Sequence, residues 1–219
     1  YSGESWFHNV IAIDNRFVSK RINQLKDWNI KFYQGEILDK DFLTKHLNNA
    51  DVVHHLAGVT DVAYVKKETN LEKDEKIQKV AVEGTNNILD AITGNCKLIF
   101  PSTHVIYEGF KKTHKNIMED EEPSPVLMYS SSKVQNENDI KKSQKNYIIL
   151  RLGSVVGYSS TDTMRINIMP NLFSKITSQN GTINLFAGGK QIKSIVPLID
   201  VVRCMKFMEE KDKIQKETF

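Results

Sequence analysis

The sequence predicts an α/β fold built on a parallel β-sheet, and three features of the chain lead to this prediction. Short apolar runs of the kind that form buried parallel strands recur along the chain. Between them lie longer segments whose apolar residues recur every three or four positions, which is typical of helices with one buried face. The composition, 40% hydrophobic and 26% charged over 219 residues, is that of a globular domain. Strands that alternate with helices indicate βαβ units with right-handed crossovers.

Five apolar runs are the expected strands. In chain order they are Asn9–Ile13, Ile30–Gln34, Asp51–Leu56, Lys97–Pro101 and Tyr147–Leu152. Helices are expected at Asp39–Leu47, in a long segment that follows the charged stretch 66–76 and ends near Gly94, and at Tyr129–Lys142. In the long segment, helical spacing relates Ile77, Val80, Ala81, Gly84, Ile88, Ala91 and Ile92. One face of that helix is therefore expected to be buried.

After Gly157 the pattern of the chain changes. Pro170 suits the first turn of a helix that runs towards Ser178, and a short strand is expected at Ile183–Phe186. Asp200 is expected to cap a last helix, Val201–Glu210. We therefore expect a sheet domain in residues 1–157 and a small lobe in residues 158–219.

Composition and cysteine usage exclude several classes of protein. The net charge is only +3 and the lysines are spread along the chain, so no nucleic-acid binding is predicted. Cys96 and Cys204 form no Cys-x-x-Cys motif, which predicts a reducing compartment and no zinc site or other metal site. His54 and His55 would point to opposite faces of a strand, so we expect packed or hydrogen-bonded roles for them. No apolar run approaches the roughly 20 residues of a membrane span, and a cytoplasmic protein is expected.

Ligands of parallel α/β sheets bind beyond the carboxyl ends of the strands. The polar or small residues expected at those ends are Asp14, Glu36, Ala57, Gly58, Ser102, Thr103 and Ser154. These residues form the expected binding rim.

A Tyr and a Lys lie four residues apart in the segment Tyr-Ser-Ser-Ser-Lys, at Tyr129 and Lys133, and would share one helix face. An ammonium there stabilises a phenolate, so the tyrosine can act as an acid or base at a carbinol or carbonyl. A second match, Tyr107–Lys111, is interrupted by Gly109 and follows a strand, so context favours the first pair.

Several short motifs occur in a fixed order along the chain. They are Val10–Asn15, Gly35–Asp39, His55–Gly58, Val82–Thr85, Pro101–Thr103 with Tyr107, Tyr129 with Lys133, Leu150–Arg151 with Gly157, Asn167 with Pro170, and Phe186 with Asp200. In this order, residues from about Asn9 to Phe219 resemble the extended short-chain dehydrogenase/reductase family, in its nucleotide-sugar epimerase/dehydratase branch. The resemblance implies a doubly wound, Rossmann-like parallel sheet with a small C-terminal substrate lobe.

The resemblance implies a role for each matching residue. Tyr129 would be the catalytic base, Lys133 would lower its pKa and hold a ribose, and Thr103 would orient the reacting sugar oxygen. NAD is the implied cofactor, because a carboxylate such as Asp14 repels the 2′-phosphate of NADP, although Arg16 nearby keeps NADP as an alternative. The implied cofactor-binding residues are Asp14, Asn15, Glu36, Ile37, Leu56, Ala57, Gly58, Ser102, Tyr129 and Lys133. Asp14 as a helix cap and Thr103 as a turn cap are the alternatives.

The implied substrate is a nucleotide sugar, held by Thr103, Ser154, Asn167 and Lys193. The branch has dehydratases with an Asp-Glu pair after the threonine, and His104-Val105 stands there instead, which disfavours 4,6-dehydration. Ser154 and Lys193 replace an Asn and an Arg of the family pattern, and Lys does not bind a phosphate in the bidentate way of Arg. An NADPH-dependent reductase of another substrate and a non-catalytic binding module are the alternative functions. A homodimer is implied by analogy.

The family opens with a strand and a glycine-rich turn that binds the cofactor pyrophosphate at a helix N-terminus. Residues 1–8 contain only Gly3, so the resemblance begins at the family's second strand and stops within its substrate lobe. We therefore expect a Rossmann-like sheet without its first strand and weak NAD binding by these 219 residues.

Overall fold

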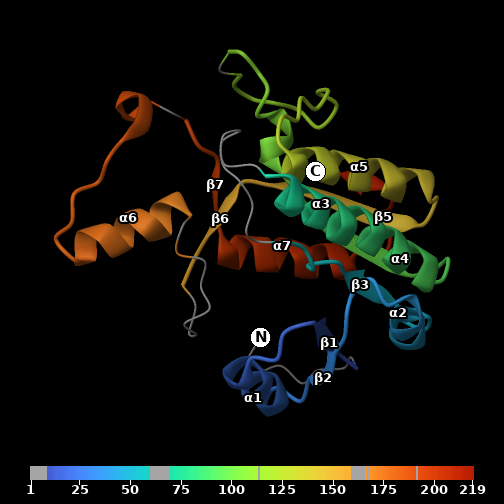
Figure 1. The fold of residues 1–219 in the computed structure, drawn as a ribbon. Coiled ribbons are helices and arrows are strands. Elements are labelled where there is room, and N and C mark those ends of the chain that lie inside the picture. Colours follow the sequence, from blue (N-terminus) through green and yellow to red (C-terminus); the bar gives the residue numbers. More distant parts are fainter. Residues whose placement is uncertain (1–8, 60–69, 113, 159–165, 167, 191) are drawn as a thin grey trace.

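A computed structural model describes residues 9–59, 70–112, 114–158, 166, 168–190 and 192–219 (Figure 1). Strands and helices alternate, and every strand pair is parallel. The α/β class and the parallel sheet predicted from the sequence are confirmed. None of the helices in these described ranges is long and apolar enough to cross a membrane.

The strands form three separate ladders. One pairs β1 (Ile11–Asp14) with β2 (Lys31–Gln34), and the largest has the order β3 (Val52–His54), β4 (Lys97–Thr103), β5 (Asn146–Leu152) and β8 (Glu217–Thr218). The third pairs β6 (Ser154–Val156) with β7 (Ile195–Pro197). Within the described residues β1 and β3 share no ladder, so the predicted sheet is divided between them.

The helices are α1 (Ser19–Asp27), α2 (Lys40–Leu47), α3 (Leu71–Gln78), α4 (Gly84–Ala91), α5 (Met128–Lys142), α6 (Met169–Ser178) and α7 (Leu198–Glu210). Helices cover both faces of the main ladder, α3, α4 and α5 on one face and α7 on the other, whereas α1 lies beside β1 and β2 and α6 extends away from the ladder (Figure 1). A π-helical turn, η2 (Lys79–Glu83), joins α3 to α4, so the predicted long helix is present but changes its pitch. Short 3₁₀ turns occur at η3 (His104–Tyr107) and η4 (Phe186–Gly189).

The core has two layers because successive side chains of a strand point to opposite faces. Leu98 and Phe100 of β4 pack with Ile88 of α4 and Ile140 of α5. Ile99, between them in sequence, packs on the other face with Met208 of α7 and with Ile148 and Leu150 of β5. Both faces of β4 and β5 are therefore covered, which explains why these strands are continuous apolar runs in the sequence.

Two sequence predictions are wrong. Ile183–Phe186 is not a strand: residues 183–185 have no regular structure and join none of the described ladders, and Phe186 begins η4. Gly188 and Gly189 then turn the chain with φ of +66° and +70°. Asp200 does not cap the last helix, because α7 begins at Leu198 with Pro197 as its N-cap and Asp200 lies in its first turn. The acidic residue there still opposes the positive end of the helix dipole.

The sequence missed α1, β6, β7 and β8. Helix α1 begins after Val18, which provides no side-chain cap, so no capping signal marks its start. Strands β6, β7 and β8 have only two or three residues each, too few for a recognisable period. Because β6 pairs with β7, the pairing of the expected lobe begins before residue 157.

Candidate active site

The carboxyl end of β4 carries Thr103, which lies opposite Leu152 in the register of β4 and β5. The Thr103 side chain accepts a hydrogen bond from the backbone N–H of Val105 at 3.3 Å and so caps η3. The turn-capping role considered from the sequence is therefore real. A hydroxyl has one donor as well as its acceptor lone pairs, so a capping Thr103 retains its O–H to donate to a ligand.

Helix α5 presents Tyr129 in its first turn and Lys133 one turn later. The start of the helix is held by Glu108, whose carboxylate accepts the backbone N–H groups of Val126 at 3.0 Å and Leu127 at 2.8 Å, and the hydroxyl of Ser130. A carboxylate at this position satisfies helix donors that have no intrahelical acceptor and opposes the helix dipole. Glu108, which the sequence did not single out, thus determines where the tyrosine-bearing turn begins.

Lys133 is anchored to β4. Its Nζ donates to the carbonyl oxygen of Pro101 at 2.8 Å and lies 4.2 Å from the centre of the Phe100 ring. Burial lowers the Lys133 pKa to about 8, and the negative charge of Glu137 opposes that decrease. An amine with this pKa is mostly protonated at neutral pH. The helix face that carries Tyr129 therefore has a fixed cation one turn away.

Beneath this face lies Glu137, which is 2% exposed. Its carboxylate accepts the Ser102 hydroxyl at 2.5 Å and the Arg151 Nη2 at 2.8 Å. The structure therefore turns the Ser102 hydroxyl, predicted to face the cofactor, towards the interior. The sequence reasoning missed Glu137 and Arg151, although Glu137 continues the four-residue spacing of Tyr129 and Lys133.

His55 follows β3 and is buried, at 3% exposed. Its Nε2 lies 2.9 Å from the Thr85 hydroxyl, which itself donates to the Ala81 carbonyl oxygen at 2.6 Å. The single Thr85 proton is thus used, so His55 Nε2 must be the donor in their shared bond. Burial, with the nearby charge of Lys133, lowers the His55 pKa to about 3. His55 is therefore a neutral, packed histidine, as the sequence indicated.

Three predicted cofactor residues gather at the carboxyl ends of β1 and β2. Asn15 Nδ2 donates to Glu36 Oε2 at 3.3 Å, and Asp14 Oδ1 accepts the backbone N–H of Arg16 at 2.9 Å. Asp14 does not cap α1, whose N-cap is Val18. Both Asp14 and Glu36 thus present carboxylates at this end of the small ladder.

The other predicted cofactor residues lie on neighbouring loops. Ile37 follows Glu36, and its carbonyl oxygen accepts the Asn87 amide at 3.1 Å. Gly84 faces Ile37 so closely that an added Cβ would lie 2.8 Å from its Cδ1. Leu56, Ala57 and Gly58 are exposed after β3, and Leu56 is 66% exposed. An exposed leucine beside two small residues makes a flat apolar surface over which a planar ligand can lie.

Of the other predicted substrate residues, Ser154 begins β6 and Lys193 lies just before β7, whereas Asn167 is outside the described residues. Ser154 donates its backbone N–H to the carbonyl oxygen of Ser194 at 2.8 Å, which brings the segment of Lys193 beside it. His104 Nδ1 lies 3.1 Å from the Leu152 carbonyl oxygen, which can only accept, so Nδ1 carries the proton. Burial, together with the Lys193 charge, lowers the His104 pKa.

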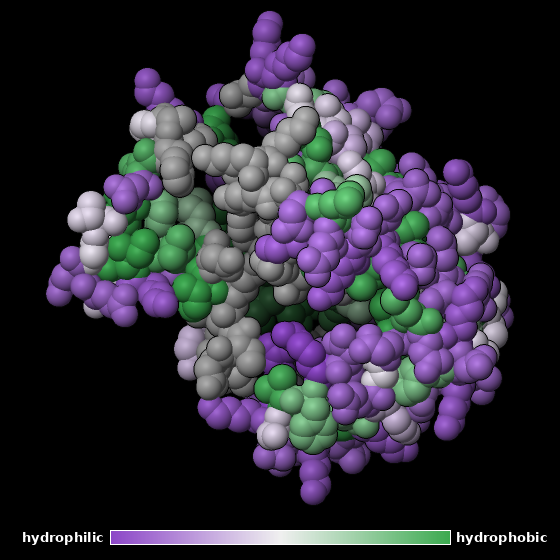
Figure 2. Space-filling view, in the orientation of Figure 1, coloured by the Kyte–Doolittle hydropathy of each residue, from purple (hydrophilic) through white to green (hydrophobic). Residues whose placement is uncertain are grey.

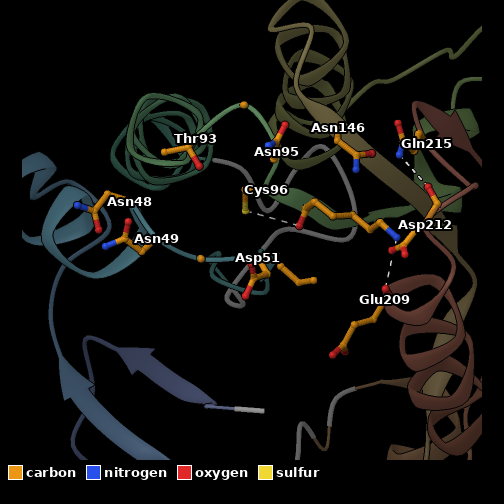
Figure 3. Close-up of a pocket in the computed structure, with 14 residues that line it drawn as sticks. Asn48, Asn49, Asp51, Thr93, Asn95, Cys96, Asn146, Glu209, Asp212 and Gln215 are labelled. Carbon is orange, nitrogen blue, oxygen red and sulfur yellow. Dashed lines mark hydrogen bonds between the residues drawn. The ribbon is translucent and has the colours of Figure 1, made fainter. Parts of the chain in front are cut away.

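A cavity of about 680 Å³ opens at the opposite, amino end of the main ladder (Figure 3). Figure 3 shows Asp51, Cys96, Asn146 and Glu209 around it, and none of the predicted site residues lines it. A second cavity, of about 330 Å³, lies between α1 and β1 and includes Asp14. Among the described residues no group of three or more His, Cys, Asp or Glu side chains could hold a metal ion.

The space-filling view in Figure 2 shows a mixture of hydrophilic and hydrophobic side chains on the face that it presents.

The motif order and the parallel ladders agree with a comparison against known protein families. The profile of the NAD dependent epimerase/dehydratase family matches residues 3–219. The chain belongs to this family. The resemblance stated from the motifs is thereby confirmed.

Individual relatives in the NAD dependent epimerase/dehydratase family are distant. A UDP-N-acetyl-alpha-D-glucosaminuronate decarboxylase of Bacillus cytotoxicus is 26% identical over 93% of this chain and 64% of its own length. A UDP-glucose 4-epimerase of Mycoplasma genitalium is 26% identical over 96% of this chain and 67% of its own length. The chain therefore spans about two thirds of these curated relatives.

Solved structures share the fold. The crystal structure of UDP-glucuronic acid 4-epimerase from Bacillus cereus, in complex with UDP-4-deoxy-4-fluoro-glucuronic acid and NAD, matches with a TM-score of 0.80 at 22% identity. The match covers 96% of this chain and 68% of that one.

Proposed function

We propose that this protein is an NAD-dependent nucleotide-sugar epimerase that acts by transient oxidation of a sugar hydroxyl. The observation that carries the proposal is the placement of Tyr129 and Lys133 on one face of α5, with Lys133 anchored to β4 two residues before Thr103. Family membership supports the same chemistry. The decarboxylase and epimerase names of the relatives support a nucleotide sugar as the substrate class.

The residues at the rim fit a dinucleotide. The carboxylates of Asp14 and Glu36 are acceptors suited to the hydroxyls of an adenosine ribose, and the Asp14 charge favours NAD over NADP. The exposed Leu56, Ala57 and Gly58 offer a flat apolar surface beneath such a ligand. Lys133 uses one donor on Pro101, and an ammonium has three, so two remain for ribose oxygens.

In the proposed mechanism Tyr129 removes the proton from the reacting sugar hydroxyl while Thr103 donates its O–H to the same oxygen. Lys133, a cation one helical turn from Tyr129, stabilises the phenolate. NAD, when bound, supplies a nicotinamide that accepts the hydride and returns it. The keto sugar then rotates, the hydride is returned to the opposite face of its carbonyl carbon, and Tyr129 returns the proton to the oxygen. The configuration at that carbon is therefore inverted and net redox is zero.

His104 and Val105 favour epimerisation over dehydration. Elimination of water needs an acid and a base beside the sugar, and this position provides no carboxylate. His104 is held by Leu152 through Nδ1, and its lowered pKa keeps it neutral at pH 7. Lys193 and Ser154 are the residues we assign to the diphosphate side of the substrate.

The test measures product and cofactor together. UDP-sugars are incubated with the protein and NAD, epimers are followed by proton NMR, and absorbance at 340 nm reports net redox. Epimer formation without a net absorbance change supports the proposal, and Tyr129→Phe is expected to abolish it. A stoichiometric absorbance change would favour a dehydrogenase or reductase instead.

Cofactor binding is tested separately by calorimetric titration of NAD and NADPH. The titrations use the 219 residues, and we expect NAD to bind more tightly than NADPH. Tighter binding of NADPH would contradict the NAD assignment.

Homodimer formation through the long helix Asp74–Thr93, which corresponds to α3, η2 and α4, and through α5 stays a prediction from the resemblance. The two helices lie side by side (Figure 1). Light scattering of the purified protein across a concentration series would show a dimer mass if the prediction holds.

A further inference from the structure

Arg151 and Glu137 form an ion pair inside the protein, where their side chains are 8% and 2% exposed. Removing two charges from water is costly, and the attraction compensates only when additional hydrogen bonds satisfy both groups. A pair in this position therefore contributes little to stability by its charge alone. Its hydrogen bonds show which parts of the molecule it joins.

The carboxylate of Glu137 is satisfied on both oxygens. Arg151 Nε lies 3.2 Å from each oxygen and Nη2 lies 2.8 Å from Oε2, which is a forked contact. The Ser102 hydroxyl donates to Oε1 at 2.5 Å. Lys141 Nζ approaches Oε2 from the next turn of α5 at 3.8 Å.

The strand register explains why two of these groups meet Glu137 together. Ser102 of β4 and Arg151 of β5 are paired residues, so their side chains leave the same face of the ladder towards α5. Glu137 lies four residues after Lys133 and eight after Tyr129, on the same face of α5. The carboxylate thus joins α5 to the residue immediately before Thr103.

The third guanidinium nitrogen of Arg151 makes hydrogen bonds away from Glu137. Arg151 Nη1 donates to the Tyr107 hydroxyl at 2.6 Å and to the Glu119 carbonyl oxygen at 2.8 Å. Tyr107 ends η3, the turn that Thr103 caps. Glu119 belongs to the segment between η3 and α5, which projects beyond the amino end of α5 (Figure 1). The Arg151 side chain therefore contacts both η3, which Thr103 caps, and the segment that leads to α5.

We propose that Glu137 and Arg151 are positioning residues that fix the spacing between Thr103 and the Tyr129–Lys133 face, and that Arg151 also anchors the segment that contains Glu119. Glu137 acts through Ser102 and through its field at Lys133, and neither residue touches the substrate. The proposal deepens the proposed function, but its test needs neither cofactor nor substrate.

The groups around Lys133 determine how replacing Glu137 changes the pH at which Lys133 loses its proton. Glu137 lies on its own helix, neutral His55 comes from the end of β3, and β4 contributes the Pro101 carbonyl and the Phe100 ring. Glu137 is the anionic group among them. Glu137→Gln is therefore expected to lower the pH at which Lys133 loses its proton by about 1 unit, the size of shift that one nearby opposite charge produces.

The first experiment is an NMR titration of ¹³C-lysine-labelled protein, in which the Cε shift of Lys133 is assigned by its loss in Lys133→Arg. Asp139→Asn is the matched control, because it removes one negative charge from α5, and among the contacts described the Asp139 carboxylate accepts a hydrogen bond from Gln135 alone. A lower midpoint in Glu137→Gln and an unchanged midpoint in Asp139→Asn support the proposal. Equal midpoints in the two variants overturn it.

The second experiment uses hydrogen exchange across segment 108–126. Arg151→Lys keeps the charge beside Glu137 but loses the planar fork that reaches Tyr107 and Glu119. Exchange in this segment should accelerate at least about tenfold, because losing one hydrogen bond from a charged donor already has an effect of that size and the variant loses two. Exchange at the unmodified rate overturns the proposal. Because Arg151→Lys retains the ion pair, this measurement decides the question even if Glu137→Gln fails to fold.

The outcomes are separable from those of the proposed function. A protein that shows both effects but epimerises no nucleotide sugar keeps the positioning roles and loses the assigned substrate. If the protein epimerises a nucleotide sugar but neither the lower Lys133 midpoint nor the faster exchange is seen, the proposed function stands and the positioning roles of Glu137 and Arg151 are rejected.

Discussion

Lys133 donates to the carbonyl oxygen of Pro101 at 2.8 Å, and this contact, together with the Ser102–Glu137 hydrogen bond, joins the helix of the proposed base to the strand of Thr103. Pro101 and Thr103 are two residues apart on β4, so their side chains share one face of the strand. The contact also removes the ammonium from solvent, which is the cause of its low pKa. Position and titration of Lys133 are therefore coupled.

We expect kcat/KM to fall as pH rises above about 8. This parameter reports groups of the free enzyme, and the Lys133 pKa is lowered by burial to about 8, so the stabilising cation is lost above that value. The pH profile of epimerisation checks this. In Lys133→Arg the guanidinium stays charged and the fall should disappear, although the maximal rate is lower. The same fall in Lys133→Arg would exclude Lys133 as its cause.

His55 is expected to make the protein acid-sensitive. Its pKa is about 3 in the folded state and 6.5 in the unfolded chain, so between these values the unfolded chain binds a proton that the folded chain does not. His55 therefore lowers the free energy of unfolding as pH falls from 6.5 towards 3, by about 1.4 kcal/mol per unit. Urea titrations at several pH values measure it. His55→Gln, which can still donate to Thr85, should show a shallower decrease.

Gly84→Ala should destabilise the protein although alanine favours helix. The new Cβ would lie 2.8 Å from Ile37 Cδ1 and 3.0 Å from two further atoms of Ile37. We expect overpacking to cost about 1–3 kcal/mol, more than the roughly 1 kcal/mol that alanine gains over glycine. Urea denaturation of Gly84→Ala, Ile37→Val and the double variant measures the coupling. Additive effects in the double variant would show that the two side chains do not collide.

Glu108→Ala should reduce stability by about 1–2 kcal/mol, because the first turn of α5 loses its capping acceptor. Tyr129 lies in that turn, so kcat should decrease with less effect on KM. Glu122→Ala is the matched control, since it removes an exposed carboxylate from the same segment. Thermal unfolding and steady-state kinetics of both variants provide the comparison. Equal losses in the two variants would contradict a capping role for Glu108.

Asp14→Ser should shift cofactor preference towards NADP. The Asp14 carboxylate stands at the end of β1, and its charge is the feature that disfavours a 2′-phosphate. Calorimetry with both cofactors measures the ratio of their Kd values. A ratio that does not change would remove Asp14 from the ribose site. Glu36→Gln, at the neighbouring strand end, shows whether the loss of any carboxylate there has the same effect.

Much of the architecture could be predicted because it depends on short-range pattern. The run Lys97–Pro101 is a strand because both of its faces are apolar, and Tyr129 and Lys133 share a face because a helix repeats about every 3.6 residues. Asp39 was expected at the start of its helix, and there it accepts the Phe42 N–H. These features need only residues that are neighbours in sequence, so the sequence by itself determines them.

The tertiary structure alone decided the surroundings of the site. Glu137 and Arg151 are 14 residues apart, and they meet because β5 pairs with β4 in one register and α5 packs above both. No local period encodes that register, just as none shows that Ser102 turns inward or that Ile183–Phe186, predicted as a strand, forms none. The physical reason is that a buried polar group forms hydrogen bonds with whichever partner lies beside it in the folded protein, however far apart the two residues are along the chain.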